Sequence, residues 1–445
     1  MGQIRRVFAA LLLLLACGFY SFAAHAADRP NIVLIMADDM GYECVTANGG
    51  QTYKTPNLDK LAAQGVRFTN GHSQPICTPS RVQIMTGRYN SKNYIRFGLL
   101  DPDATTFANR LRDAGYATCI VGKWQLKGGF EGPNRFGFDE YCLWQLIRRP
   151  NRYPNPGLEI NGKEVDYKNG EYGPDVVTDY ACDFIDRHAE GDKPFLLYYP
   201  MMLPHWPFEP TPDSEDWDPE FRRSDEAEKG YRGMRNQPHF VGMVAYTDKM
   251  VGKLLAKLDA AGVRDNTLVI FTGDNGTYAG ITSVLDGKPY KGGKGTTLIN
   301  GTHVPLLVDW PGKAKAGSVC EDLIDFTDVL PTLLGAAGVD PPKDAQLDGR
   351  SFLPQVLGEP GDPRAWVYCW YKRNGDEKVA QEFAMDKRYK LYSDGRLFDY
   401  RADPAEAQPI APADRTAEQR AVAKRLEAAI KAHTRVEDRA GQSSG

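Results

Sequence analysis

The chain has 445 residues, of which 54 are Lys or Arg and 58 are Asp or Glu, so its formal net charge is −4. This length exceeds that of one small domain. A charge so close to balance argues against nonspecific binding to nucleic acid.

The first 27 residues have the pattern of a secretory signal. Arg5 and Arg6 precede an apolar stretch at residues 7–17, and small residues follow around Ala24 and Ala26. This stretch is too short for a membrane span, and no later stretch is long enough. We therefore expect an exported protein, secreted or periplasmic, with no stable membrane insertion.

Two almost wholly apolar runs, residues 31–37 and 268–273, predict strands that are buried on both faces. Each run ends in a pair of oxygen-bearing side chains: Asp38 and Asp39 after the first, Asp274 and Asn275 after the second. Open α/β sheets bind ligands outside the carboxyl ends of their strands. Oxygen ligands of this kind favour a hard cation, Ca²⁺ or Mg²⁺. Taken singly, each pair is more typical of a solvated turn or a helix N-cap than of a metal site.

Cys77 stands at the expected start of a helix. A Pro suited to the first helical turn follows two positions later, and Gly87 is placed to end the segment. The free N–H groups and the dipole of a helix N-terminus favour an anion, and Arg81 and Arg88 add positive charge. A buried thiol in the core is the alternative interpretation of a lone cysteine.

Apolar strands alternate with amphipathic helices up to about residue 339. The helices are expected at residues 56–64, 105–114, 177–188, 240–261 and 323–338. This alternation predicts an α/β fold with a large, mostly parallel sheet flanked by helices.

After Pro341 and Pro342 the pattern changes. Short aromatic strands are expected at residues 366–371, 382–385, 389–392 and 397–400, and a helix at residues 416–433. They predict a smaller C-terminal antiparallel sheet with a packed helix. We expect a catalytic domain at residues 28–342, a C-terminal α+β subdomain at 343–435 and a disordered tail at 436–445.

Two turn-rich segments, residues 143–174 and 207–237, are expected to carry substrate contacts, because loops on a rigid scaffold commonly carry specificity. The first contains Arg148, Arg149 and Arg152. Each of these arginines, taken singly, is equally typical of a solvated surface.

Six cysteines outside the signal segment and position 77 are widely scattered. They are Cys44, Cys119, Cys142, Cys182, Cys320 and Cys369. Export permits disulfides, but the sequence leaves open whether these residues pair or stay buried free thiols.

The run Cys77-Thr78-Pro79-Ser80-Arg81, followed by Thr86-Gly87-Arg88, resembles the signature of the type I, formylglycine-dependent sulfatases of the alkaline-phosphatase-like superfamily. The resemblance implies that a formylglycine-generating maturation enzyme oxidises Cys77 to formylglycine (3-oxoalanine). The hydrate of its aldehyde then attacks the sulfur of a sulfate ester. The resemblance also implies one Ca²⁺, which polarises the ester and is held by Asp38, Asp39, Asp274, Asn275 and residue 77. The family shares the large α/β domain and the smaller C-terminal one.

Three further short matches fall in the order of the family: Gly122-Lys123-Trp124, Pro204-His205-Trp206-Pro207 and Gly293-Lys294-Gly295-Thr296. The resemblance implies that Lys123 and Lys294 hold sulfate oxygens and that His205 gives a proton to the leaving alcohol. Arg81 belongs to the same catalytic set. Taken singly, each Lys is typical of a solvated surface.

The chain departs from the family at Gln125, where a His is usual, and at residues 299–303, which replace the usual Glu-Gly-Gly-x-Arg. A Gln forms hydrogen bonds but cannot act as a base near neutral pH. Either another group acts as the base for sulfate elimination, or this step is slower. Candidates for that base are His205 acting twice, His72 and His303.

These patterns predict an exported sulfuric ester hydrolase. Trp206 and Phe208 beside His205 offer a surface for a sugar face, which favours a sulfated carbohydrate over an aryl sulfate. One alternative is a phosphonate or phosphodiester hydrolase on the same scaffold. The other, motivated by Gln125, is a noncatalytic protein that binds sulfated glycans.

Overall fold

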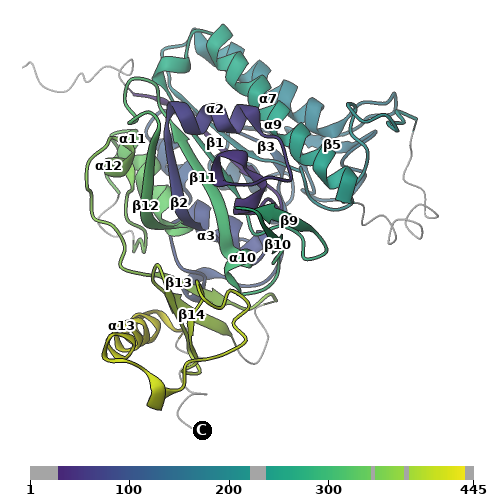
Figure 1. Cartoon of the computed structure of the whole chain (residues 1–445). Coiled ribbons are helices and arrows are strands. Elements are labelled where there is room, and N and C mark those ends of the chain that lie inside the picture. Colours follow the sequence, from purple (N-terminus) through teal and green to yellow (C-terminus); the bar gives the residue numbers. More distant parts are fainter. Residues whose placement is uncertain (1–28, 221–236, 342–345, 375–379, 436–445) are drawn as a thin grey trace, which may run out of the picture.

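The computed structural model describes residues 29–220, 237–341, 346–374 and 380–435. At its centre is a ten-stranded sheet in the order β12-β2-β11-β8-β1-β7-β3-β4-β5-β6. Figure 1 shows helices packed along this sheet and a smaller C-terminal layer beyond one of its ends. The predicted signal segment and the predicted disordered tail lie outside the described residues.

Most neighbouring strands of the large sheet run parallel, as predicted. Its strands are β1 (Asn31–Ala37), β2 (Val66–His72), β3 (Ala117–Lys123), β4 (Glu140–Trp144), β5 (Gly157–Ile160), β6 (Lys163–Asp166), β7 (Phe195–Pro200), β8 (Thr267–Gly273), β11 (His303–Asp309) and β12 (Ser318–Asp325). Strand β11 is antiparallel to both of its neighbours, and the hairpin β5–β6 adds an antiparallel edge. A separate hairpin is formed by β9 (Thr282–Leu285) and β10 (Lys288–Lys291).

The helices lie close to their predicted positions. They are α2 (Pro56–Gln64), α3 (Cys77–Thr86), α4 (Asn90–Asn93), α5 (Phe107–Asp113), α6 (Gly132–Arg135), α7 (Gly173–Ala189), α9 (Gln237–Ala260), α10 (Ile299–Thr302), α11 (Val329–Ala336), α12 (Leu353–Val356) and α13 (Ala417–His433). Within the described ranges, none of these helices is both long and apolar enough to cross a membrane.

Strand β1 shows why both faces of the sheet are covered. Ile32 and Leu34 belong to one hydrophobic cluster, and Val33 and Ile35 belong to another. Successive side chains of a strand point to opposite faces, so an uninterrupted apolar run needs partners on both. Helices α3, α5 and α11 supply apolar side chains to the first cluster, and α2, α7 and α9 to the second.

The C-terminal layer is the predicted antiparallel sheet with one helix. Its strands are β13 (Val367–Tyr371), β14 (Gln381–Met385), β15 (Tyr389–Tyr392) and β16 (Leu397–Asp399). Helix α13 packs on one face of this sheet, and the other face contacts Ile76 and Cys77 of the large domain. Phe352 and Val356, at α12, still belong to the core of the large sheet, and the domain division at residue 342 stays a prediction.

The helix predicted at residues 323–338 begins too early. Leu323 and Ile324 belong to strand β12, and α11 starts only at Val329. Asp325 ends the strand because its side chain accepts the Thr327 N–H (2.9 Å), while its own N–H donates to the Asp328 carboxylate (2.9 Å). Apolar residues suit a strand as well as a helix, and pairing with β2 decides between them.

Candidate active site and metal centre

The oxygen-bearing side chains predicted at two strand ends come together, because β1 and β8 are adjacent parallel strands. Ala37 lies opposite Gly273, so the residues that follow both strands emerge at one edge of the sheet. The Asp39 N–H donates to Asp274 Oδ1 (2.9 Å), and Asn275 Nδ2 donates to Asp39 Oδ1 (2.9 Å). Asp39 has a left-handed backbone with φ of 67°, which turns the chain into the site.

Within the part of the chain that the structure describes, two oxygens in this group have no hydrogen-bond partner. They are Asp38 Oδ1 and Asn275 Oδ1, and both are buried. Buried polar atoms are nearly always satisfied, so these two indicate a missing ligand. Carboxylate oxygens of Asp38 and Asp39 and a ring nitrogen of His205 lie within 4.8 Å of one another. The donor set fits a hard divalent cation such as Ca²⁺.

Three buried or half-buried cations surround these carboxylates. Lys123 Nζ lies 2.7 Å from Asp38 Oδ2, Lys294 Nζ lies 2.5 Å from Asp39 Oδ2, and Arg81 Nη2 lies 3.4 Å from Asp274 Oδ2. Arg81 also donates to the backbone oxygen of Lys123 (3.0 Å). The structure therefore brings Arg81, Lys123 and Lys294 to the predicted metal ligands.

Burial and neighbouring charges shift the pKa values of Asp38 and Asp274 in opposite directions. Burial alone would raise the pKa of Asp38, but the positive charges of His205 in its protonated form, Lys123 and Arg81 hold it well below its usual range. Burial raises the pKa of Asp274, and the negative charge of Asp38 acts in the same direction. A bound cation would stabilise the ionised form of both carboxyl groups.

Cys77 begins α3, as predicted. The residue before it is extended, and Gly87 ends the helix with φ of 65°. The Cys77 side chain is buried, and burial raises the pKa of its thiol, although Lys123 and Lys294 oppose this shift. An unmodified thiol at this position is therefore protonated near neutral pH and is a weak nucleophile.

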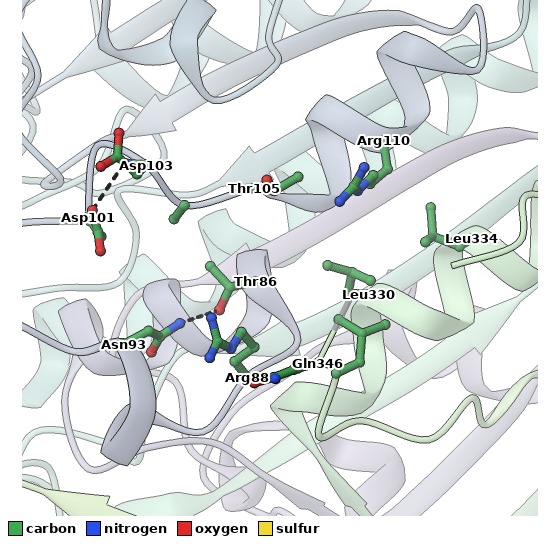
Figure 2. Close-up of a pocket in the computed structure, with 12 residues that line it drawn as sticks. Thr86, Arg88, Asn93, Asp101, Asp103, Thr105, Arg110, Leu330, Leu334 and Gln346 are labelled. Carbon is green, nitrogen blue, oxygen red and sulfur yellow. Dashed lines mark hydrogen bonds between the residues drawn. The ribbon is translucent and has the colours of Figure 1, made fainter. Parts of the chain in front are cut away.

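Arg88 does not join this site, so the prediction that its charge lies beside Cys77 is wrong. It follows the C-terminal end of α3, about 16 Å from Cys77 at 1.5 Å per helical residue. There it lines a hollow of about 330 Å³ together with Thr86, Asn93 and Arg110 (Figure 2).

His205 lies in the turn that follows β7. Its Nδ1 contacts the carbonyl oxygen of Trp206, which can only accept, so Nδ1 carries the proton. Nε2 lies 3.7 Å from Asp39 Oδ2. Burial lowers the pKa of His205 well below its usual value, and this outweighs the opposing effect of Asp38. The free ring is neutral, and an anion bound beside it would favour the protonated form that can donate to a leaving group.

Trp206 and Phe208, the two aromatic residues predicted to contact a sugar beside His205, have different surroundings in the structure. Phe208 is fully buried and packs edge-on against Phe240 and Tyr278, with ring centroids 5.0 and 5.7 Å away. The prediction that Phe208 stacks on a sugar is therefore wrong. Trp206 is only partly buried.

Gln125 and the alternative bases occupy different places. Thr78 Oγ1 donates to Gln125 Oε1 (3.2 Å), which places this amide beside the first turn of α3. His72 and His303 line another hollow of about 690 Å³, together with Tyr42. Burial lowers the pKa of His303 to about 4. Among the described residues that line this hollow there is none of the predicted metal ligands.

Glu43, four residues after Asp39, is a buried acid that sequence reasoning missed. It is 1% exposed, and burial raises its pKa to about 7. The next residue, Cys44, contacts Thr277 (3.3 Å between Sγ and Oγ1), and the Gly41 N–H donates to the same hydroxyl (3.0 Å). A charged residue within an otherwise buried stretch just after Asp39 was the available signal.

None of the seven cysteines within the described residues forms a disulfide. Six are fully buried, and Cys320 is partly exposed. The sequence left open whether these cysteines pair, and in the structure they are free thiols.

Family models match almost the whole described chain. Residues 30–339 match the model described as Sulfatase. Residues 297–435 match the model described as N-sulphoglucosamine sulphohydrolase, C-terminal.

Individual proteins extend this similarity. N-acetylgalactosamine-6-sulfatase of Canis lupus familiaris is 32% identical over 383 residues, covering 78% of this chain and 69% of the relative. N-acetylglucosamine-6-O-sulfatase of Bacteroides thetaiotaomicron is 25% identical over 477 residues, covering 86% of this chain and 82% of the relative. The crystal structure of Ps i-CgsB in complex with k-i-k-neocarrahexaose has a TM-score of 0.75 at 27% identity, covering 91% of this chain and 93% of the other.

Proposed function

The chain belongs to the sulfatase family, and from this premise we propose that it removes sulfate from a sulfated carbohydrate. Hydrolysis of sulfate esters is the activity of the family. The sugar is proposed because two relatives are named for sulfated amino sugars and a structural neighbour was solved with k-i-k-neocarrahexaose. Trp206, which is only partly buried beside His205, supports this choice.

We propose that a formylglycine-generating enzyme converts Cys77 to formylglycine and that one Ca²⁺ is held by residue 77 with the four strand-end ligands, Asp38, Asp39, Asp274 and Asn275. The observation that carries this proposal is the pair of unpartnered, buried oxygens on Asp38 and Asn275. When present, the cation polarises the sulfate ester and the aldehyde hydrate supplies the nucleophile.

The other side chains bind and orient the sulfate. Lys123 and Lys294 each use one ammonium hydrogen on an Asp and keep further donors for sulfate oxygens. Arg81 holds Asp274 and the Lys123 backbone, so it positions both sides of the site. His205 donates a proton from Nε2 to the alcohol oxygen as the S–O bond breaks.

Gln125 is proposed to position the nucleophile rather than to move protons. Its side-chain oxygen already accepts from Thr78, which follows Cys77 directly. The base for the second half-reaction is then His205, because His72 and His303 line a separate hollow.

Export is proposed from the sequence pattern of residues 1–27. Protein recovered from the producing cell should lack this segment, and its N-terminus should be found near residue 28. An N-terminus at Met1 in protein outside the cytoplasm would contradict this proposal.

Sulfate release over a panel of sulfated mono- and polysaccharides tests the proposed function. The enzyme is purified with its maturation partner and assayed with Ca²⁺ and with a chelator. We expect release from at least one sulfated sugar, loss on chelation and recovery with Ca²⁺. Faster cleavage of phosphonate or phosphodiester analogues than of every sulfate ester would contradict it.

A further inference from the structure

Arg152 is a buried cation that is 4% exposed. Two of its guanidinium nitrogens, Nε and Nη1, have no hydrogen-bonding partner among the described residues. Arg148 in the same segment differs, because it pairs with carboxylates of Glu159 (2.9 Å), Glu164 (3.4 Å) and Asp166 (2.7 Å). Buried charges are normally paired, so an unpaired guanidinium indicates a ligand.

Arg152 is held in place through its flat face. Its Cζ lies 3.9 Å from the centroid of the Trp144 ring, and Trp144 Nε1 is fixed by a bond to the Pro150 oxygen (3.0 Å). A guanidinium that stacks on an aromatic face keeps its N–H donors in its own plane. The stack therefore orients Arg152 without using its hydrogen-bonding capacity.

The position of Arg152 is tied to the proposed active site. The next residue, Tyr153, donates its hydroxyl to the backbone oxygens of His205 (2.5 Å) and Met202 (3.0 Å). Trp144 lies opposite Lys123 in the register of β3 and β4. Tyr153, which follows Arg152, thus contacts His205, the residue proposed to protonate the leaving oxygen. Trp144, on which Arg152 stacks, lies opposite Lys123, which is proposed to bind the sulfate.

Strand order places Arg152 beside the metal centre rather than over it. Strand β4, which ends at Trp144, is the third strand from β1, with β7 and β3 between them. At about 4.8 Å per strand, this is a lateral distance of about 14 Å from the strand that ends at Asp38. The His205 turn follows β7 on this side. Trp144, on which Arg152 stacks, therefore lies on the side of the metal centre from which the His205 turn emerges, whereas Lys123 and Lys294 contact the metal-site carboxylates directly.

We propose that Arg152 binds a second anionic group, a carboxylate or a further sulfate, on the sugar that carries the scissile ester. This inference rests on the proposed sulfatase function. It specifies the substrate as a polyanionic sugar and makes Arg152 a specificity-determining residue.

The test compares Arg152→Met and Arg152→Lys with the wild type on three substrates. These are a monosulfated hexosamine, the same sugar with a second sulfate, and the monosulfated hexosamine linked to a uronic acid. We expect wild-type enzyme to prefer one of the two polyanionic sugars, which identifies the second anion. Arg152→Met should lower kcat/KM for that sugar about 10- to 100-fold, mainly through KM, and so reduce the preference. Arg152→Lys should be intermediate.

Arg149→Met is the matched control. Arg149 is exposed and lies farther from the same ring, 5.9 Å from the Trp144 centroid. It should keep the substrate preference of the wild type. An equal loss on all three substrates after Arg152→Met, or no loss on any, would overturn the proposal.

Failure of the proposed function has a different signature. It would appear as no sulfate release by wild-type enzyme whose position 77 is converted. The affinity for the polyanionic sugars, measured by calorimetry, then tests whether Arg152 binds the second anionic group. A loss of affinity of about tenfold or more in Arg152→Met supports it, and equal affinities overturn it.

Discussion

At the scale of single residues, the site is a cluster of buried side chains with opposite charges. Lys123, Lys294 and Arg81 each contact a carboxylate that is also expected to contact the cation. Desolvation makes each unpaired charge costly, so we expect the proposed cation and the sulfate to complete the pairing of these side chains.

Replacing Asp274 with Asn tests the metal ligands. The substitution keeps the shape of the side chain but removes its charge, so Ca²⁺ affinity should fall by roughly 10- to 100-fold or more, and sulfate release should fall with it. Metal content and sulfate release are measured on the same preparations. Asp265→Asn, at an exposed position just before the same strand, is the control. Full metal content and activity in Asp274→Asn would rule out this ligand.

Glu43 predicts how stability depends on pH. Its pKa is raised from 4.5 to about 7 by burial, so the folded protein holds this proton more tightly than the unfolded chain does. The stabilisation is complete below about pH 4.5 and is lost as pH rises through 7. Glu43→Gln should therefore raise the free energy of unfolding at pH 8 by roughly 3 kcal/mol and have little effect at pH 4.5. Exposed Glu131→Gln should show no such dependence. An equal effect of Glu43→Gln at both pH values would refute the assignment.

The side chains that the structure gathers at the edge of the sheet that carries the site could be named from the sequence, because strand ends and a helix start are local patterns. The sequence could not separate Arg148 from Arg152, since the two differ only in tertiary surroundings: one meets three carboxylates and the other meets an indole ring. For the same reason, Phe208 was predicted at the surface although it packs in the core.

At the scale of elements, α3 connects the proposed nucleophile to the core. Its first residue, Cys77, lies within electrostatic reach of Lys123 and Lys294, and its C-terminal Gly87 has a left-handed backbone. A side chain at Gly87 would also meet Leu330 (3.1 Å) and Leu347 (3.2 Å).

Gly87→Ala should destabilise the protein through both effects. The left-handed backbone costs about 1–2 kcal/mol, and overpacking adds about 1–3 kcal/mol. Gly98→Ala separates the two contributions, because Gly98 also has a left-handed backbone (φ of 77°) but no atom near an added Cβ. Urea unfolding should show a larger loss for Gly87→Ala. Equal losses would show that Leu330 and Leu347 give way freely.

Element types were predictable where periodicity is long and flanks are clear, as in β1, α3 and α13. The segment at residues 323–338 was not, because a strand and a helix meet there without a break. The capping contacts of Asp325 and Asp328 that separate them depend on the folded chain.

At the scale of the whole molecule, the C-terminal sheet packs against the segment of the large domain that carries Cys77. Its apolar face packs against Cys77, and Cys369 Sγ donates to Gln74 Oε1 (3.2 Å) just before α3. Lys390, in strand β15 of this sheet, forms an almost fully buried pair with Glu406 at 2.7 Å.

Breaking this buried pair should be costly. Glu406→Gln leaves the Lys390 charge without its partner, and we expect a loss of about 3–5 kcal/mol in the free energy of unfolding. The control is Glu427→Gln, which breaks the exposed pair with Lys431 (2.6 Å) and should cost less than about 1 kcal/mol. Similar losses for the two variants would mean that the buried pair contributes no more to stability than the exposed one.

The most direct test of the account is to relate sulfate release to the state of residue 77. Preparations with graded exposure to the maturation enzyme are analysed by mass spectrometry, where conversion of Cys77 lowers the peptide mass by about 18 Da. We expect the rate of sulfate release to rise in proportion to the converted fraction and to reach zero when none is converted. Full activity in a preparation whose Cys77 is entirely an unmodified thiol would contradict the account.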